Sequence, residues 1–275
     1  MTIQGATAIP AQSSSPLLRE TIDGIAVLTL DSPKSRNALS EAMLASLQAQ
    51  LDAIRDDNAI RAVVIAANGP AFSSGHDLKE LTARRTDLDN GRAYFAQIMT
   101  ACSTMMQTIV HLPKPVVAAV QGLATAAGCQ LVATCDLAVA SEHATFATPG
   151  IDIGLFCSTP MVALSRNVPR KHAMHMLLTG EAVSAQRAEE LGLVNSVVPA
   201  GQERQGAIDL AKKIAIKSAY TLKVGKEAFY RQAEMSLADA YLYTAQVMTE
   251  NMLARDAQEG IGAFIEKRAP KWEDR

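Results

Sequence analysis

The chain has 275 residues, of which 48% are hydrophobic and 20% are charged, and its formal net charge at pH 7 is −2. This length and apolar content suit one large domain, or a core with an appendage. The near-neutral charge gives no electrostatic reason to expect a nucleic acid or an anionic membrane as partner. No apolar run reaches the roughly 20 residues that a membrane-spanning helix needs.

The first sixteen residues read MTIQGATAIPAQSSSP. They have neither the basic start nor the apolar block of a secretory signal, and they contain no arginine, which argues against a mitochondrial presequence. We therefore expect a flexible lead at 1–16. The four cysteines lack metal-type spacing, so we expect reduced core thiols and no metal site at Cys102, Cys129, Cys135 and Cys157. Together these features predict a cytoplasmic protein.

The chain then opens with a hairpin and a helix. The segment LLRETIDGIAVLTLD (17–31) predicts two strands that meet at Asp23-Gly24, a common two-residue hairpin turn. The segment at 40–54 has apolar residues at helical spacing, and Ser40 is a suitable N-cap for it.

Strands and helices alternate through the middle of the chain, which predicts an α/β fold with largely parallel sheets. The expected elements are a strand at 61–67, a Gly- and Ser-rich loop at 68–77, a helix at 92–110, a strand at 115–122 and, after a short helix, a strand at 136–141. After about residue 200 the strand pattern ends, and a series of helices follows with no proline before Pro270.

Two segments share a design that suits chemistry on a carbonyl group. Both PAFSSGHDLKE (70–80) and GLATAAGCQ (122–130) place glycine and small residues after an apolar strand and before a helix. Backbone N–H groups at a helix start lack intrahelical partners and carry partial positive charge. Two such ends facing one carbonyl oxygen would form an oxyanion hole. The alternative is that the small residues only allow close packing.

Other catalytic patterns find little support. The chain has no phosphate-binding loop, no H-E-x-x-H and no dinucleotide-binding G-x-G-x-x-G. Ser73, Ser74, His76 and Asp77 cluster, but no G-x-S-x-G turn supports a hydrolase. We interpret Cys157 as a buried thiol in preference to a nucleophile. The remaining histidines are interpreted as surface or packing residues: His111, His143, His172 and His175.

Five segments carry a resemblance to a known family: SPKSRNALS, GPAFSSGHDLKE, PKPVVAAVQGLATAAGCQLVATCDLAVAS, ATFATPGIDIGL and GIGAFIEKRAPKW. In this order and spacing they resemble the crotonase (enoyl-CoA hydratase/isomerase) superfamily over 17–272. Within it, GLATAAGCQ and GLFCSTP are similar to the enoyl-CoA hydratase domain-containing protein 3 type.

The resemblance implies a spiral of β-β-α turns at 17–200, and a helical trimerisation region at 201–275 in a homotrimer or dimer of trimers. It implies an acyl-CoA or enoyl-CoA ligand, with coenzyme A as part of the substrate and no tightly bound cofactor. The oxyanion donors would be the backbone N–H groups of His76 and Ala127. The implied coenzyme A contacts are Lys34, Ser35, Arg36, Ala38, Ser74, Asp77, Leu78, Lys79, Phe264 and Lys267, the last two often from a neighbouring subunit.

The sequence departs from the family at both catalytic carboxylates. Hydratases of this family use two glutamates on the attacking water and the α-carbon; here those positions hold Gln130 and Gly150. Asp152 is the nearest carboxylate, and it would face the same side as Gly150 only if the segment were a strand. Asp77 has a second interpretation as a helix N-cap.

Two functions remain open at this point. One is an enzyme on acyl-CoA thioesters with weak or altered hydratase-type chemistry, in which Gln130 orients a water by hydrogen bonding. The other is a non-catalytic acyl-CoA-binding or regulatory protein. A hydrolase on the same fold is a distant third.

Overall fold

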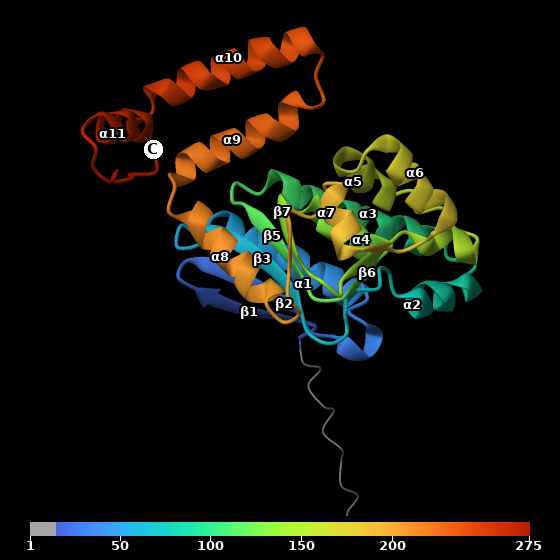
Figure 1. Ribbon diagram of the computed structural model, residues 1–275. Helices are drawn as coiled ribbons and strands as arrows, with labels where there is room; N and C mark the ends of the chain where they lie inside the picture. Colours follow the sequence, from blue (N-terminus) through green and yellow to red (C-terminus); the bar gives the residue numbers. More distant parts are fainter. Residues whose placement is uncertain (1–14) are drawn as a thin grey trace, which may run out of the picture.

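The computed structural model describes residues 15–275, so most of the expected lead at 1–16 lies outside the described residues. The described chain forms two sheets surrounded by helices (Figure 1). The first sheet has six strands in the order β1-β2-β3-β5-β7-β10. Its strands are β1 (Leu17–Ile22), β2 (Ile25–Leu30), β3 (Ala62–Ala67), β5 (Val116–Val120), β7 (Leu137–Ser141) and β10 (Ser196–Val198).

The hairpin predicted at Asp23-Gly24 is present. Strands β1 and β2 pair antiparallel from Ile22↔Ile25 outward, and both turn residues have positive φ, 50° at Asp23 and 78° at Gly24. All other pairs of the first sheet are parallel. Parallel neighbours need crossover connections, and these carry the helices.

A second sheet has four strands in the order β4-β6-β8-β9. Its strands are β4 (Ala71–Ser73), β6 (Leu123–Thr125), β8 (Thr145–Ala147) and β9 (Val183–Ser184). The chain alternates between the sheets: β3 is followed by β4, β5 by β6 and β7 by β8, and a helix follows each pair. This is the repeated β-β-α turn expected of the fold. Strand β4 lies within the segment that we expected to be a loop.

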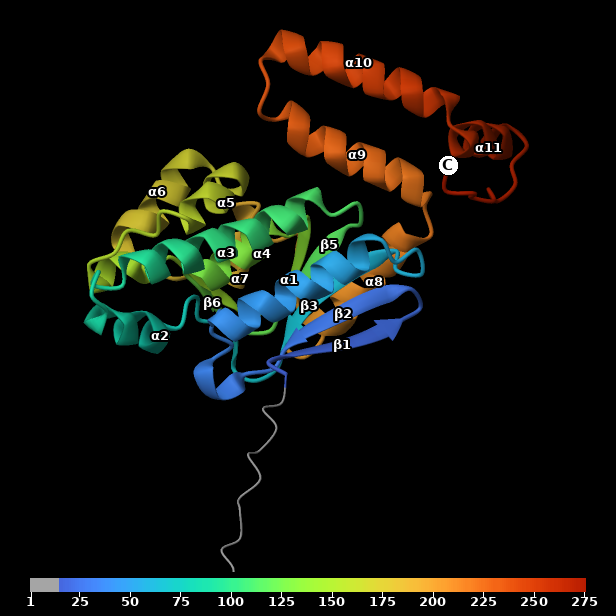
Figure 2. The same ribbon diagram turned by 180° about the vertical axis from the view of Figure 1, so that it is seen from behind.

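Helices cover both faces of the first sheet. Figures 1 and 2 show α8 on one side, and α1 and α3 on the other. The helices of this part are α1 (Glu41–Arg55), α2 (Leu78–Ala83), α3 (Arg92–His111), α4 (Ala127–Thr134), α5 (Pro160–Asn167), α6 (Arg170–Thr179), α7 (Ala185–Glu190) and α8 (Glu203–Ala215), with short 3₁₀ helices η1 (Pro33–Ser35), η2 (Arg84–Thr86) and η3 (Pro149–Ile153).

Alternation along the strands explains how both faces are buried. In β2, Ile25 and Val27 pack in the cluster under α8, while Ala26 and Leu28 pack in the larger cluster with α1 and α3. Successive side chains of a strand point to opposite faces. The expected N-cap of α1 is confirmed, because Ser40 Oγ accepts from the Met43 N–H at 3.2 Å.

Three further helices stand away from the sheets (Figure 1): α9 (Ala219–Gln232), α10 (Leu237–Leu253) and α11 (Arg255–Ile265). A partly buried ion pair holds α9 to the core, with Lys226 Nζ 2.7 Å from Asp136 Oδ2. Tyr230 donates to the other carboxylate oxygen at 2.8 Å. Burial lowers the pKa of Lys226. Two backbone carbonyls also accept from its ammonium, which satisfies the partly buried charge.

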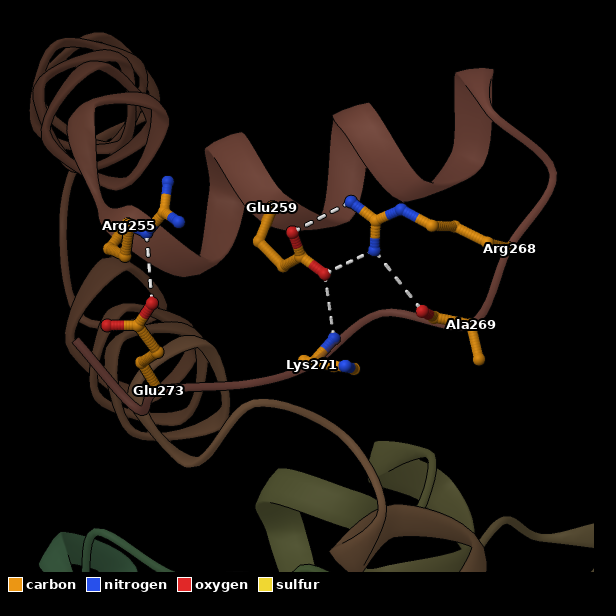
Figure 3. A pocket seen from close by; sticks show the side chains of 6 residues that line it. All are labelled: Arg255, Glu259, Arg268, Ala269, Lys271 and Glu273. Carbon is orange, nitrogen blue, oxygen red and sulfur yellow. Dashed lines mark hydrogen bonds and ion pairs between the residues drawn. The ribbon is translucent and has the colours of Figure 1, made fainter.

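The C-terminal tail folds back along α11. Buried Asp256 accepts from the N–H groups of Glu273 and Asp274 at 2.7 and 2.9 Å. Figure 3 shows the other attachment, in which the Glu259 carboxylate accepts hydrogen bonds from the Arg268 guanidinium and from the Lys271 N–H. The cleft between α11 and the tail is therefore lined by arginines already paired with glutamates, and we interpret it as structural.

The tail should respond to acid. The hydrogen bonds from Arg268 lower the pKa of Glu259 from 4.5 to about 2. Because this folded-state pKa lies below the ordinary one, its stabilisation is complete above pH 4.5 and is lost as the pH falls toward 2. Trp272, the only tryptophan, donates from its indole N–H to the Ile216 carbonyl at 2.9 Å. Its fluorescence therefore reports whether the tail is attached.

We expect Glu259→Gln to shift Trp272 emission to the red at pH 7 without loss of far-ultraviolet circular dichroism, because the tail is released while the helices remain. In the wild type the same shift should develop between pH 4.5 and 2. Glu250→Gln, on the exposed face of α10, is the matched control and should leave emission unchanged. Unchanged emission in Glu259→Gln would contradict this attachment.

Candidate active site

The two small-residue segments meet at the end of the second sheet. Strands β4 and β6 pair in parallel, so the loops at their carboxyl ends lie side by side. A Cβ atom built on Gly75 would lie 3.1 Å from the Ala127 nitrogen, and one on Gly128 would lie 2.2 Å from the Ser73 carbonyl oxygen. A side chain at Gly128 would overlap the Ser73 carbonyl, and Gly75 has φ 82°, in the left-handed region that favours glycine, so glycine suits both places.

The backbone between β6 and α4 is strained. Ala126 has φ 50° and ψ −119°, a conformation that residues with a side chain rarely adopt. Its N–H donates to the Ala147 carbonyl of β8 at 2.9 Å, which holds the turn in place. Strain of this kind concentrates at functional sites. Here it sets the direction of the following N–H, that of Ala127, the first residue of α4.

Two backbone donors are available at this place. Within residues 15–275, neither the His76 nor the Ala127 N–H donates a hydrogen bond to the protein. Each belongs to the strand-to-helix turn expected to supply an oxyanion donor. Position Ala127 also benefits from the partial positive charge of a helix start.

Gln130 lies one turn into α4 and is only 5% exposed. Its Oε1 has no hydrogen-bond partner among the described residues. The whole of α4 is buried and has no charged side chain. Gln130 therefore places a neutral amide in a neutral surrounding.

Gly150 lies in η3, where space and not backbone conformation limits substitution. Its φ is outside the left-handed region. A Cβ at this position would lie 2.8 Å from the Leu155 carbonyl oxygen and 2.9 Å from Cys157 Sγ. Burial raises the pKa of Cys157, so this thiol is protonated at neutral pH. The thiol fills the space in which a side chain at position 150 would begin.

Asp152 does not share a strand with Gly150. The segment starts with Pro149 and forms the 3₁₀ helix η3, so the alternation that would place both residues on one face does not apply. The carboxylate is exposed, and its Oδ2 lies 2.9 Å from where a Cβ of Gly180 would be. Asp152 is thus directed toward the end of α6.

His76 carries a second unusual feature. Both ring nitrogens are buried and without a partner in the described part of the chain. Burial lowers the pKa of His76, with only the backbone of Leu39 acting in the opposite direction. The ring is therefore neutral at pH 7, with one donor and one acceptor nitrogen.

The expected coenzyme A loops lie next to each other. The Ser74 N–H donates to the Arg36 carbonyl at 3.0 Å, and Ser74 Oγ lies 3.3 Å from the Ser35 carbonyl oxygen. Fully buried Asn37, which sequence reasoning missed, joins the loops: its amide donates to the carbonyls of Asn68 and Ala71, each at 2.8 Å. Lys34 lies in η1, and Ala38 is buried.

The other expected contacts divide into two groups. Asp77 is the N-cap of α2, accepting from the N–H groups of Lys79 and Glu80 at 2.8 and 3.3 Å, and Leu78 and Lys79 are exposed. Phe264 and Lys267 lie at the end of α11, which stands far from α4 in both views of the same chain (Figures 1 and 2). Within one chain, they are not part of this site.

Comparison with known proteins gives the family. The model of the enoyl-CoA hydratase/isomerase family matches residues 20–275. The chain belongs to this family. Human enoyl-CoA hydratase domain-containing protein 3, mitochondrial, is 50% identical over 257 residues, which cover 94% of this chain and 83% of the human protein. The 2,3-dehydroadipyl-CoA hydratase of Escherichia coli (strain K12) is 34% identical, covering 91% of this chain and 96% of that protein.

Solved structures agree with this assignment. The crystal structure of the human domain-containing protein 3 matches with a TM-score of 0.89 and 50% identity, covering 94% of this chain and all of that one. An enoyl-CoA hydratase of Mycobacterium smegmatis matches with the same TM-score and 48% identity, covering 94% and 99%. The crotonase fold and the resemblance to the domain-containing protein 3 type are confirmed.

One expectation is wrong. We predicted a cytoplasmic protein, partly because the first sixteen residues contain no arginine. The domain-containing protein 3 relatives from human, rat and mouse are all named mitochondrial, which contradicts that prediction. The composition of a short terminal segment was too weak a basis for assigning a compartment.

The described residues lack two kinds of feature. Among residues 15–275 there is no helix with the length and apolar character to cross a bilayer. The described part of the chain also contains no group of three or more His, Cys, Asp or Glu residues placed to hold a metal ion.

Proposed function

We propose that this protein binds acyl-CoA thioesters and polarises the thioester carbonyl between the N–H groups of His76 and Ala127. The observation that carries this proposal is the close approach of two glycine-containing turns, which leaves both N–H groups unpaired. Donors fixed in this way stabilise negative charge on an oxygen without reorganisation, and they lose nothing when side chains nearby change.

We propose that hydration is weak, because both carboxylate positions are replaced. General acid–base assistance is worth about 10²–10⁴-fold for each group, or about 3–5 kcal/mol of barrier. Gln130 can orient a water but cannot take its proton. Neither Gly150 nor the protonated Cys157 thiol beside it supplies a base at neutral pH. Carbonyl polarisation then remains without efficient proton transfer.

A second candidate is a non-catalytic protein that sequesters acyl-CoA. The contact at Gly150 favours it, because Cys157 Sγ and the Leu155 carbonyl leave no room for a second carboxylate. The packing around position 150 therefore suits glycine and not glutamate. Kinetics distinguish the two functions, since the binder shows no turnover at any substrate concentration.

We expect wild-type protein to hydrate crotonyl-CoA at least about 10³-fold below the roughly 10 s⁻¹ typical of enzymes. Gln130→Glu alone should raise this little, because the two carboxylates act on one water as a unit. The triple variant Gln130→Glu, Gly150→Glu, Cys157→Gly should raise it by at least about 100-fold, since the third change removes the sulfur contact. Ultraviolet absorbance of the enoyl thioester measures the rate.

The Leu155 carbonyl still has to move in the triple variant, so thermal unfolding of each variant is the folding control. Gln130→Glu, Cys157→Gly without the change at position 150 is the matched variant and should stay slow. Wild-type hydration at about 1–10³ s⁻¹ would contradict the proposed loss of acid–base assistance.

We also propose a homotrimer or a dimer of trimers, assembled through residues 201–275. Helix α10 has no buried residue, yet it carries exposed apolar side chains, namely Leu237, Tyr241, Leu242, Met248, Met252 and Leu253. Apolar surface of this extent marks an interface. Phe264, 85% exposed, and Lys267 would then contact the coenzyme A of a neighbouring subunit. A monomer by light scattering at micromolar concentration would contradict this assembly.

A further inference from the structure

The C-terminal tail is bonded to two separate parts of the molecule. One of them is the start of α11, where buried Asp256 accepts from the N–H groups of Glu273 and Asp274. In return, the Asp256 N–H donates to the Arg275 carbonyl at 2.9 Å. Figures 1 and 2 show the C-terminus between α11 and the start of α9. Hydrogen bonds in both directions therefore fix the tail to the first turn of α11.

The other part is the core. The Asp274 carboxylate forms an ion pair with Arg61, whose Nη2 lies 3.2 Å from Asp274 Oδ1. Arg61 directly precedes β3, and its side chain also donates to the Lys217 carbonyl at 2.8 Å. The same Asp274 oxygen accepts at 2.7 Å from the N–H of Ala219, the first residue of α9. One carboxylate therefore joins the first sheet to the point where the outer helices leave the core.

Trp272 makes a second connection of the same kind. Its indole N–H donates to the carbonyl of Ile216, the residue that ends α8. Its ring packs against α11, because a Cβ atom built on Gly260 would lie 3.1 Å from a ring carbon. Trp272 and Asp274 thus both link the junction between α8 and α9 to α11.

These bonds determine where α11 lies relative to the core. Helices α9 to α11 stand away from the sheets (Figure 1). Other side-chain bonds between these helices and the core act on α9 or on the turn after it: Lys226 and Tyr230 with Asp136, and Arg166 with Glu234. Among the hydrogen bonds and ion pairs of residues 15–275, those of the tail are the ones that connect α11 to the core.

The far end of α11 carries the contacts proposed above for the coenzyme A of a neighbouring subunit. Phe264 lies in the last turn of this 11-residue helix, and Lys267 lies two positions after its end. A helix of this length spans about 16 Å, so a tilt of about 10° at its start moves its end by about 3 Å. A shift of this size breaks contact between an aromatic ring and a stacked base.

We propose that Arg61 and Asp274 are positioning residues for coenzyme A binding. Through the tail they fix α11 in the orientation in which its end reaches the nucleotide part of a neighbouring subunit's ligand. This inference rests on the proposed thioester binding and on the proposed assembly. It adds that an ion pair at the start of β3, in the core of one subunit, controls the affinity for ligand in the next subunit.

Calorimetry with two ligands tests this role. Butyryl-CoA carries the nucleotide part, and butyryl-pantetheine has the same acyl chain and thioester without it. Arg61→Gln and Asp274→Asn should each weaken the binding of butyryl-CoA by at least about fivefold, the low end of what an aromatic ring stacked on a base contributes. Both variants should bind butyryl-pantetheine as the wild type does, whereas damage to the fold would weaken the binding of both ligands.

A mutant cycle connects the ion pair to α11. The variant Phe264→Ala, Lys267→Ala should also bind butyryl-CoA more weakly, and adding Arg61→Gln to it should cause no further loss, because the contacts to be positioned are gone. Lys212→Gln is the matched control. It removes another surface ion pair, that of α8 with Asp23 at 2.7 Å, and should bind both ligands as the wild type does.

The outcomes separate this inference from the function on which it rests. Unchanged affinity of Arg61→Gln for butyryl-CoA, equal weakening of both ligands, or additive losses in the cycle would each overturn it, while thioester binding would stand. Light scattering should give Arg61→Gln the wild-type mass. Dissociation would also overturn the inference, because the pair would then maintain the assembly and not the orientation of α11. No binding of butyryl-CoA to the wild type up to millimolar concentration would instead refute the proposed function.

Discussion

The close approach of two backbones is the constraint on which the rest of this site depends. Ser73–Gly75 and Ala126–Gly128 come nearer than any side chain allows, as the 2.2 Å between a Cβ on Gly128 and the Ser73 oxygen shows. Pairing of β4 with β6 brings them together, and the bond from Ala126 to Ala147 holds the strained turn. The folding free energy of two sheets maintains two unpaired N–H groups in place.

In the function that we propose, this arrangement allows the two carboxylates to be absent while the rest of the fold persists. Polarising a carbonyl oxygen requires only backbone donors, so changes at positions 130 and 150 leave it intact. The two positions have different surroundings. Gln130 keeps a polar side chain with an unpaired oxygen, whereas the space beside Gly150 is filled by Cys157. We infer that binding has been retained and proton transfer has been reduced.

Local patterns predicted local structure well. The hairpin at Asp23-Gly24, the N-cap at Ser40 and the N-cap at Asp77 each depend on a few neighbouring residues, and all three are present. Strand β4 was missed because its three residues are ordered by pairing with Leu123 and Ala124, about fifty positions away. The Asn37 side chain makes three hydrogen bonds, two described above and one accepted from the Ser32 N–H. These bonds, and the lack of a partner for the Thr148 hydroxyl among the described residues, arise only in the folded chain, so no local sequence pattern predicts them.

Difference infrared spectroscopy of butyryl-CoA with a ¹³C-labelled thioester carbonyl tests the central claim most directly, because it reports polarisation separately from turnover. The claim predicts that the carbonyl stretching frequency falls on binding below its value in water, since two fixed N–H donors draw electron density onto the oxygen. A bound carbonyl frequency equal to that in water would contradict the claim that His76 and Ala127 form an oxyanion hole.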